Sequence, residues 1–351
     1  MSRQEYFAAA NTADGFISCF DRIFDPSKLN DLYIIKGGPG TGKSSVMRRV
    51  AEAAEKRGHG VEYYYCSSDP SSLDGILIPK LSFGMLDGTS PHMTDPAYPG
   101  AADTIFDIYP YLNTKLLRQR REDVTALTDK NKLLHRRSAA YRRFAGEAER
   151  EASSLIETCV DKQKLTSAVN RAAEVKGVQG IAEHRQISAF STKGKVTLQT
   201  FENEAKTKIG VCDEHGSAYI FMNGLKNALI KKRAAFYYSL DTLLPTRCEA
   251  ILIKNSGEYF SITGRMADTD RNNYDKLINM KRFIKTDILK DVRGRLRLCE
   301  RIRDTLENEA QRLISEAGRV HDRLEAVYNG AVDFDGIRAA ADRVIESRIK
   351  N

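Results

Sequence analysis

The sequence predicts an α/β fold in which small parallel-sheet cores carry long helical-hairpin insertions of the coiled-coil type, with one core-plus-arm unit present twice. Three observations in the 351 residues predict it. Short apolar runs alternate with helix-like segments, which is typical of parallel sheets covered by helices. Two long charged segments repeat apolar residues every seven positions. The order of elements in the first half of the chain recurs in the second half.

The first core is centred on a glycine-rich segment with a complete phosphate-binding pattern, G-x-x-x-x-G-K-[ST]. The segment reads Gly37, Gly38, Pro39, Gly40, Thr41, Gly42, Lys43 and Ser44, and Ser45 follows it. Backbone N–H groups of such a loop surround a phosphate chain, the lysine reaches the terminal phosphates, and the serine hydroxyl joins the shell of a magnesium ion. We therefore predict a P-loop core that binds ATP and Mg²⁺ through these nine residues, with Lys43 as a catalytic residue and Ser44 as a metal ligand.

The segments on either side of the loop fit this prediction. Residues 32–35 form a short apolar run before the loop, and residues 45–57 carry apolar side chains at helical spacing after it. Gly58 ends this helix, and residues 61–66 have the composition of a second strand. A strand, a helix and a strand in this order predict a right-handed parallel unit.

A carboxylate is predicted at the tip of a later strand, because the apolar run 81–87 ends in Asp87. An aspartate beside the loop orders the water shell of the metal, so Asp87 is a candidate metal ligand and catalytic residue, with a simple strand-end turn as the alternative. Gly88 follows where many ATPases carry a glutamate that activates water, and this predicts slow hydrolysis. His92 and Asp95 are candidate substitute bases, or else residues of a capped turn.

The segment upstream of the loop has turn chemistry over residues 11–16 and predicts a helix over 17–23. Segments in this position lie near the nucleotide base in many phosphate-loop proteins, so Asn11 and Thr12 are candidates to contact adenine. The alternative is a helix N-cap at Thr12 or Asp14.

From about residue 112 the chain becomes charged, free of proline and helical. Mostly apolar or small residues recur at heptad spacing, at positions 117, 124, 131, 138, 145, 152 and 159 and at 127, 134, 141, 148 and 155. We predict a long helix that turns near residues 160–161 and returns through Leu165, Val169 and Ala172 as a helical hairpin.

The first part of this arm is basic, with ten Lys or Arg against three Asp or Glu between Lys115 and Arg143. Two interpretations stay open: a surface that binds nucleic acid or an acidic protein, and the solvated face of a coiled coil. Arg118, which with Arg120 and Arg121 lies nearest the first core in sequence, is a candidate catalytic lid arginine for the terminal phosphate.

The second half of the chain repeats the first in outline. Residues 249–253 match 74–78 at an offset of 175, and a second heptad arm over 292–327 precedes a return helix over 336–349. The predicted division is 1–111 for the P-loop core, 112–188 for the first helical arm, 189–268 for a degenerate P-loop-like repeat and 269–351 for the second arm.

The repeat has lost the phosphate-binding pattern. Its loop reads Cys-Asp-Glu-His-Gly-Ser over residues 212–217, without the lysine and with two carboxylates that repel a triphosphate. We predict that this unit does not bind ATP in the P-loop manner. A metal or acid/base cluster of Cys212, Asp213 and His215 is the alternative interpretation.

The chain resembles a family of uncharacterised bacterial predicted ATPases that are built from two tandem P-loop modules with helical insertions. The residues that carry the resemblance are 10–16, 33–45, 87–92, Asp95-Pro96 and 99–101. The resemblance implies ATP binding and, by analogy, hydrolysis. In this family the second module commonly looks able to bind nucleotide as well, and the loop of the second half departs from that pattern.

Composition indicates the cellular compartment and the charge of possible partners, but not the function. No apolar run reaches the length of a membrane span and the N-terminus lacks a signal-peptide layout, so we expect a cytoplasmic protein without membrane contact. Six cysteines are scattered singly, as in reduced proteins, and a net charge of +8 favours anionic partners.

Three functions are compatible with these features. The first is a slow Mg²⁺-dependent ATPase or an ATP-driven conformational switch that moves the helical arms. The second is a kinase for a small molecule or a nucleotide, which also needs a loop, a metal carboxylate and lid arginines. The third is a non-enzymatic scaffold that binds nucleic acid or protein through the basic arm. The oligomeric state is left open.

Overall fold

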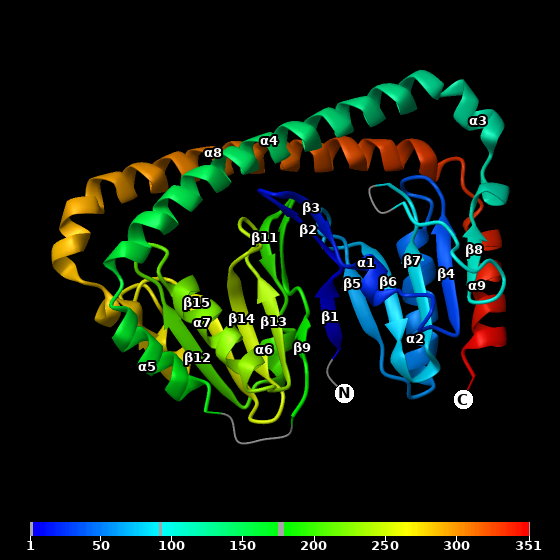
Figure 1. Cartoon of the computed structure of the whole chain (residues 1–351). Coiled ribbons are helices and arrows are strands. Elements are labelled where there is room, and N and C mark those ends of the chain that lie inside the picture. The colour runs from blue at the N-terminus through cyan, green and yellow to red at the C-terminus, as the bar shows by residue number, and fades with distance from the viewer. Residues whose placement is uncertain (1–2, 91–92, 175–178, 351) are drawn as a thin grey trace.

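The chain folds into two six-stranded sheets spanned by a pair of long helices, in a computed structural model that describes residues 3–90, 93–174 and 179–350. Figure 1 shows the long helices lying across one end of both sheets. No helix in the described part of the chain is both long and apolar enough to cross a membrane.

The first sheet has the strand order β1-β5-β6-β7-β4-β8. Its strands are β1 (Gln4–Phe7), β5 (Glu62–Tyr65), β6 (Leu73–Ile78), β7 (Phe83–Asp87), β4 (Asp31–Lys36) and β8 (Asp103–Asp107). All strands run in one direction except β6, which is antiparallel to both β5 and β7. The prediction of a parallel sheet is therefore wrong for β6, because the connections on either side of it are too short for a crossover.

The second sheet has the same order and the same directions when it is followed from β9 to β16. Its strands are β9 (Ala182–His184), β13 (Phe236–Leu240), β14 (Cys248–Ile253), β15 (Glu258–Thr263), β12 (Thr207–Cys212) and β16 (Lys276–Asn279). Here β14 is the one antiparallel strand of the sheet. Each sheet is thus mixed, and the two correspond strand by strand.

A hairpin and a short helix follow the first strand of each sheet. They are β2 (Ala9–Thr12), β3 (Gly15–Ser18) and α1 (Phe20–Ile23) in the first half, and β10 (Ser188–Ser191), β11 (Gly194–Thr197) and α6 (Thr200–Glu204) in the second. The predicted helix over 17–23 is wrong at its start. Residues 17 and 18 belong to β3, and the turn predicted over 11–16 is present: the Thr12 hydroxyl donates to the Gly15 carbonyl at 2.8 Å, and Gly15 has φ 106°.

A helix of 14 residues packs on the outer face of each sheet, and the other faces, with α1 and α6 on them, contribute to a shared apolar cluster. Helix α2 (Lys43–Lys56) packs on the first sheet and α7 (Ala218–Lys231) on the second. Alternate residues of β4 face opposite ways: Ile35 joins the core under α2, whereas Ile34 joins a core shared with Leu252 and Tyr259 of the second sheet. The two sheets are therefore joined through one apolar cluster.

The long helices form an antiparallel pair. They are α4 (Arg121–Cys159), preceded by α3 (Thr114–Gln119), and α8 (Thr286–Asn329). The Asn131 amide donates to the Ala317 carbonyl at 3.0 Å, and the Ser138 hydroxyl donates to the Ala310 carbonyl at 2.9 Å. Residue numbers thus rise on one helix as they fall on the other. The predicted heptad positions face a helix from the other half of the chain.

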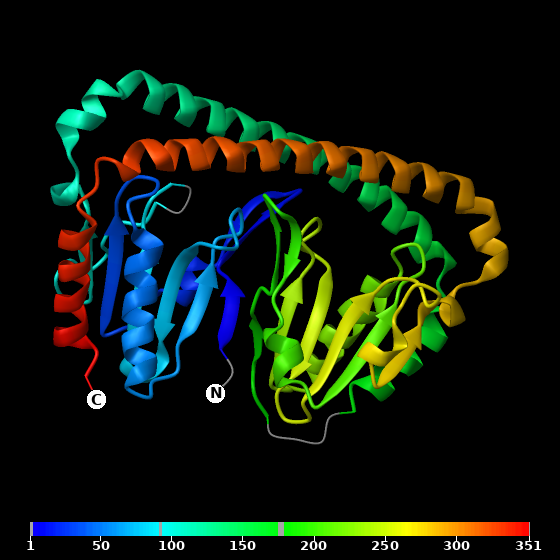
Figure 2. The same cartoon turned by 180° about the vertical axis from the view of Figure 1, so that it is seen from behind.

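The two predicted helical hairpins are wrong in their packing partners. The chain does turn at residues 160–161, but α5 (Lys162–Ala172) packs on α7 of the second sheet, through Leu165 and Val169. Reciprocally, α9 (Phe334–Arg348) packs on α2 of the first sheet, as Figure 2 shows from behind. A helix of 39 residues spans about 58 Å, so α4 carries its end from the first sheet to the second.

Four short 3₁₀ helices complete the described part of the chain. They are η1 (Pro79–Leu81), η2 (Tyr109–Tyr111), η3 (Arg271–Asn273) and η4 (Met280–Phe283). Two of them precede the long helices and are followed by matching bridges. Leu112 after η2 pairs with Val332, and Ile284 after η4 pairs with Val160. The end of each long helix therefore lies against the segment that precedes the other long helix.

Candidate functional site

The glycine-rich loop joins the end of β4 to the first turn of α2. Gly40 and Gly42 have left-handed backbones, with φ 64° and 85°, and Gly42 is the N-cap of α2. The Thr41 hydroxyl donates to the Gly38 carbonyl at 2.8 Å and closes the turn. The unpaired N–H groups at a helix N-terminus carry partial positive charge, so the loop has the local geometry of an anion site.

Lys43 and Asp87 meet beside this loop. The Lys43 ammonium donates to the carbonyls of Gly38 at 2.8 Å and Gly37 at 3.2 Å, and it lies 3.5 Å from a carboxylate oxygen of Asp87. The two strands that carry the loop and Asp87 are neighbours, with Ile35 opposite Asp87. The structure thus brings together the two residues that the sequence placed 44 positions apart.

The donor set beside the loop fits magnesium in its chemistry. The Ser44 hydroxyl accepts from the Leu73 N–H at 3.0 Å, and Asp87 accepts from the N–H and hydroxyl of Thr89 at 3.0 and 2.6 Å. A hydroxyl and a carboxylate are hard oxygen donors, and Mg²⁺ commonly takes one or two protein oxygens together with water and phosphate. No group of three His, Cys, Asp or Glu in the described residues forms a closed metal cage.

The end of α8 and the start of α9 lie directly on the loop. A Cβ atom placed on Gly38 would come within 2.7 Å of the Tyr328 ring, and one on Gly40 within 2.9 Å of the Glu325 backbone. A Cβ atom on Gly42 would lie 3.4 Å from the Phe334 ring. Gly38 and Gly40 thus allow the C-terminal segment of the chain to approach the loop closely, because a Cβ atom at either position would collide with it. The sequence motif alone does not reveal this contact.

Glu325 brings a negative charge to this contact. Its carboxylate lies 3.4 Å from His321, one helical turn earlier. Hydrogen bonding from His321 is the main cause that lowers the pKa of Glu325, and the Gly40 N–H also lowers it. Sequence reasoning missed Glu325, since nothing in a heptad pattern indicates that the last turn of the second arm reaches the first loop.

Other predicted residues lie elsewhere. Arg118 is exposed on α3, and no hydrogen bond or ion pair links it to the loop within the described residues. The Asn11 amide donates to the Ser68 hydroxyl at 3.3 Å. The Asp95 carboxylate pairs with Lys36 at 2.9 Å, which ties the segment after β7 to β4. His92 lies outside the described residues.

The corresponding loop of the second half is closed by its own carboxylate. Asp213 accepts from the N–H groups of Gly216 and Ala218, both at 2.7 Å, at the start of α7. Burial raises the pKa of Asp213, although these hydrogen bonds oppose the shift. A carboxylate therefore occupies the position at the helix N-terminus where the first loop presents N–H groups.

The alternative cluster at this loop is not formed. Cys212 lies against the Met266 sulfur, Asp213 caps α7, and His215 lies 3.0 Å from Glu300 of α8. Each of the three side chains has a separate partner. Within the described ranges they form no metal-binding group.

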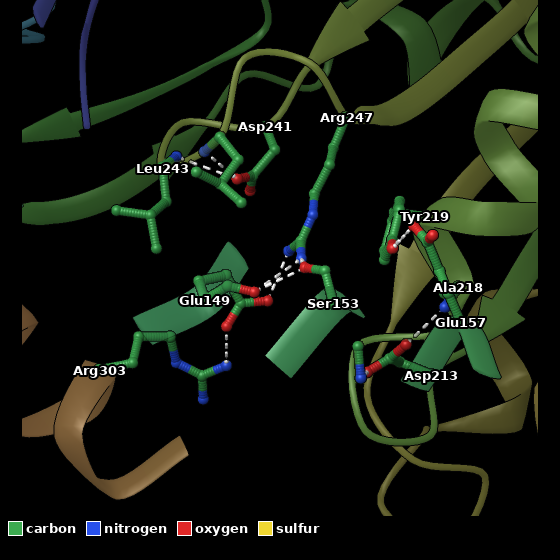
Figure 3. A network of polar contacts seen from close by, with 12 residues as sticks. Glu149, Ser153, Glu157, Asp213, Ala218, Tyr219, Asp241, Leu243, Arg247 and Arg303 are labelled. Carbon is green, nitrogen blue, oxygen red and sulfur yellow. Dashed lines mark hydrogen bonds and ion pairs between the residues drawn. The ribbon is translucent and has the colours of Figure 1, made fainter. Parts of the chain in front are cut away.

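A buried ionic network holds both long helices against the second half (Figure 3). Glu149 of α4 is 4% exposed and accepts from Arg247 at 2.5 Å and from Arg303 of α8 at 2.7 Å. Arg247 also donates to the Ser153 hydroxyl. A buried carboxylate with two guanidinium partners fixes the long helices to this half of the molecule.

Comparison with known proteins gives one partial match. Residues 18–77 match the family model described as Nephrocystin 3, N-terminal. This segment runs from the end of β3 through the glycine-rich loop to β6 and covers about a sixth of the chain. No curated protein and no solved structure matches the chain. The similarity is thus confined to the part of the molecule that contains the loop.

Proposed function

We propose that this protein binds Mg-ATP at the glycine-rich loop and acts as a slow ATPase or an ATP-driven conformational switch. The observation that carries the proposal is the Lys43–Asp87 distance of 3.5 Å at the N-terminus of α2, beside a loop with the complete phosphate-binding pattern. The backbone N–H groups would hold the phosphates and Lys43 would contact their terminal oxygens. Ser44 and Asp87 would hold Mg²⁺, which neutralises charge that develops on the phosphates.

Two features favour slow rather than fast hydrolysis. Gly88 stands at the position that supplies a water-activating carboxylate in many ATPases, so this position has no side chain. Asp95, which follows soon after, is bound to Lys36 and to no group of the loop in the described structure.

The conformational part of the proposal rests on the helices. The end of α8 touches the loop, and the same helix pairs with α4 and reaches the second half of the molecule. A change at the loop would thus be transmitted through one continuous helix of 44 residues.

We also propose that the two halves arose by internal duplication and that the second is a degenerate P-loop unit. Identical strand orders, identical pairing directions and the two reciprocal end helices support it. The Asp213 cap supports loss of phosphate binding, since an internal anion occupies the helix N-terminus.

The test is Mg-ATP binding and phosphate release by the intact protein, compared with Lys43→Ala. We expect Lys43→Ala to weaken ATP binding about a hundredfold or more, because it removes the cation that meets the terminal phosphates. Lys231→Ala, at an exposed lysine near the end of α7, is the matched control and should bind as the wild type does. Unchanged binding in Lys43→Ala would refute the proposal. ATP consumption that requires an added metabolite would identify a kinase instead.

A second candidate function, nucleic-acid binding, is favoured by the basic end of α8. Eight exposed Lys or Arg residues in this region have no ion-pair partner among the described residues: Lys281, Arg282, Lys285, Lys290, Arg293, Arg295, Arg297 and Arg301. Lys290, Arg293, Arg297 and Arg301 follow one another at helical spacing and form one stripe. A row of unpaired cations on a rigid helix matches a phosphate backbone.

This candidate has its own test, the salt dependence of binding to mixed DNA and RNA. Replacing Arg293, Arg297 and Arg301 by Gln should lower the slope of log affinity against log salt by about 2 to 3. The control replaces Lys28, Lys164 and Arg338, which are exposed but paired with an acidic residue three positions away. Absence of any binding at low salt would exclude this function.

A further inference from the structure

The contact between α8 and the glycine-rich loop places an acidic residue beside the site proposed for phosphate. The Glu325 carboxylate lies 3.4 Å from His321, and the Gly40 backbone N–H is among the groups that lower the pKa of Glu325. A Cβ atom on Gly40 would lie 2.9 Å from both Cα and Cβ of Glu325, and 3.1 Å from the Asn329 amide oxygen. The last turn of α8 is thus in van der Waals contact with the loop.

An anion is the group that this position attracts. The N–H groups before α2 have no helical acceptors and lie at the positive end of the helix dipole. A carboxylate close to these groups is stabilised for the reason that a phosphate would be. Two anions of this charge cannot share the site without strong repulsion, since a triphosphate brings several negative charges to the same N–H groups.

The second half of the molecule shows the same arrangement in permanent form. There the anion is Asp213, which belongs to the loop itself and is held by two N–H groups at 2.7 Å. In the first half the anion comes from a different element, 285 positions after Gly40, on the end of a helix. Unlike Asp213, it belongs to a separate helix and not to the loop.

We propose that Glu325 is a built-in competitor of nucleotide phosphate, and that Mg-ATP binds only as the last turn of α8 leaves the loop. This inference rests on the proposed function above. The displaced turn continues into Tyr328, which lies on Gly38, and through Gly330 into α9. Nucleotide binding would therefore loosen the joint between α8 and α9.

The first experiment measures the dissociation constant for Mg-ATP in Glu325→Gln and Glu325→Ala. Both should bind about threefold to tenfold more tightly than the wild type, because the charge that competes with phosphate is gone. Asp322→Asn is the matched control: it removes one charge from an exposed position on the same turn and should leave the constant unchanged. Thermal unfolding of each variant confirms that it is folded.

The outcomes separate this inference from the proposed function. If the wild type does not bind Mg-ATP, the proposed function fails and the competition has nothing to act on. If the wild type binds, Lys43→Ala does not, and Glu325→Gln equals Asp322→Asn, the function stands and the competitor role is refuted. Weaker binding in Glu325→Gln would also refute it, since the carboxylate would then assist the nucleotide.

A second experiment reports on the helix directly. Hydrogen–deuterium exchange of the peptide over residues 320–330 should rise when Mg-ATP is added to the wild type, and should stay constant in Lys43→Ala. Exchange that falls or does not change on binding would show that the last turn of α8 stays in place. That result would overturn the proposal even if Glu325→Gln bound more tightly.

Discussion

The two halves of this molecule have sheets with the same strand order but differ in the loop before the helix on the outer face of each sheet. Both sheets have six strands in the same order, with one antiparallel strand at the same place. In the first half the loop before α2 is rich in glycine and Lys43 begins the helix, whereas in the second half α7 begins with Ala218, whose N–H donates to Asp213. The framework therefore positions a loop at a helix N-terminus, and the residues of the loop decide whether that terminus can receive an external anion.

The contacts that join the two halves are of two kinds, one symmetric and one not. The short helix after each long helix packs on the sheet of the other half: α5, which follows α4, packs on the second sheet, and α9, which follows α8, packs on the first. One buried ion pair at the interface comes from a single arginine of the second half. Arg185, just after β9, pairs with Glu62 of β5 at 2.8 Å and donates to the Tyr64 hydroxyl at 2.6 Å. This ion pair is largely buried, and it is one of several polar contacts that join the two halves.

The largest expected effect is on this ion pair. Arg185→Ala should lower the free energy of unfolding by about 3–5 kcal/mol, because it leaves the Glu62 carboxylate buried without its partner. Urea unfolding gives the value. Arg49→Ala breaks the exposed pair with Asp342 between α2 and α9 and should cost less than about 1 kcal/mol. Equal losses in the two variants would show that the buried pair has no special place in the interface.

The next effect compares the two loops directly through Gly40→Ala and Gly216→Ala. Both glycines have positive φ, 64° and 79°, so each substitution should cost about 1 kcal/mol in backbone strain. At Gly40 the new methyl group also meets the Glu325 backbone at 2.9 Å, while at Gly216 the nearest atom is a Glu149 oxygen at 3.6 Å. We expect a further loss of about 1–3 kcal/mol at Gly40 alone.

Urea unfolding of both variants measures this difference. A larger loss in Gly40→Ala would be the energetic signature of α8 seated on the loop. If both variants lost the same free energy, the contact between α8 and the first loop would be too loose to distinguish the two halves.

A smaller effect is expected at the cap of the second loop. Asp213→Ala removes the acceptor for the N–H groups of Gly216 and Ala218 and should cost about 1 kcal/mol, as loss of a helix N-cap does. It should not create an ATP site, since no lysine stands at the start of α7. Unfolding in urea and ATP binding in the Lys43→Ala background provide the two measurements. Recovery of ATP binding in the double variant would show that the second loop retains a site.

The sequence predicts the first loop well because its signals are local. A strand over 32–35, the glycine pattern and a helix over 45–57 agree with β4 and α2 to within a few residues. Asp87 follows from the same kind of evidence, an apolar run with a carboxylate at its end. Whether these residues bind ATP and Mg²⁺ stays a prediction.

The sequence does not predict the partners of the long helices. A heptad pattern determines which face of α4 is apolar, but it carries no information about which helix covers that face. A turn at residues 160–161 favours a hairpin by proximity, yet the observed partner of Asn131 is Ala317. The contact of Glu325 with Gly40 depends on this pairing and on the length of α8, so it cannot be derived from the loop motif.

The missed hairpin after β1 has a different cause. The turn chemistry over residues 11–16 indicates that the chain reverses there, but the four-residue strands on either side are too short to show a strand pattern in the sequence. The hairpin is also joined to the second half of the molecule, where the Ala13 N–H donates to the Leu243 carbonyl at 2.9 Å. Tertiary contact thus contributes to a hairpin that local signals do not specify.

The smallest expected effect concerns the acidic side chain that α8 brings to the second loop. Glu300 lies 3.0 Å from His215, and this hydrogen bond is the main cause that lowers the pKa of Glu300 from 4.5. A carboxyl group whose pKa is lower in the folded chain stabilises the fold above its unfolded pKa, and it loses that contribution as the pH falls through the folded pKa.

The free energy of unfolding of the wild type should therefore be higher than that of Glu300→Gln by up to about 1 kcal/mol near pH 6. This difference should shrink below pH 4.5. Urea unfolding of both chains between pH 3.5 and 6 tests this, with Glu346→Gln on the exposed face of α9 as the control. A difference that stayed constant or grew in acid would mean that His215 does not hold the charge of Glu300, and the second loop would then contact α8 by packing alone.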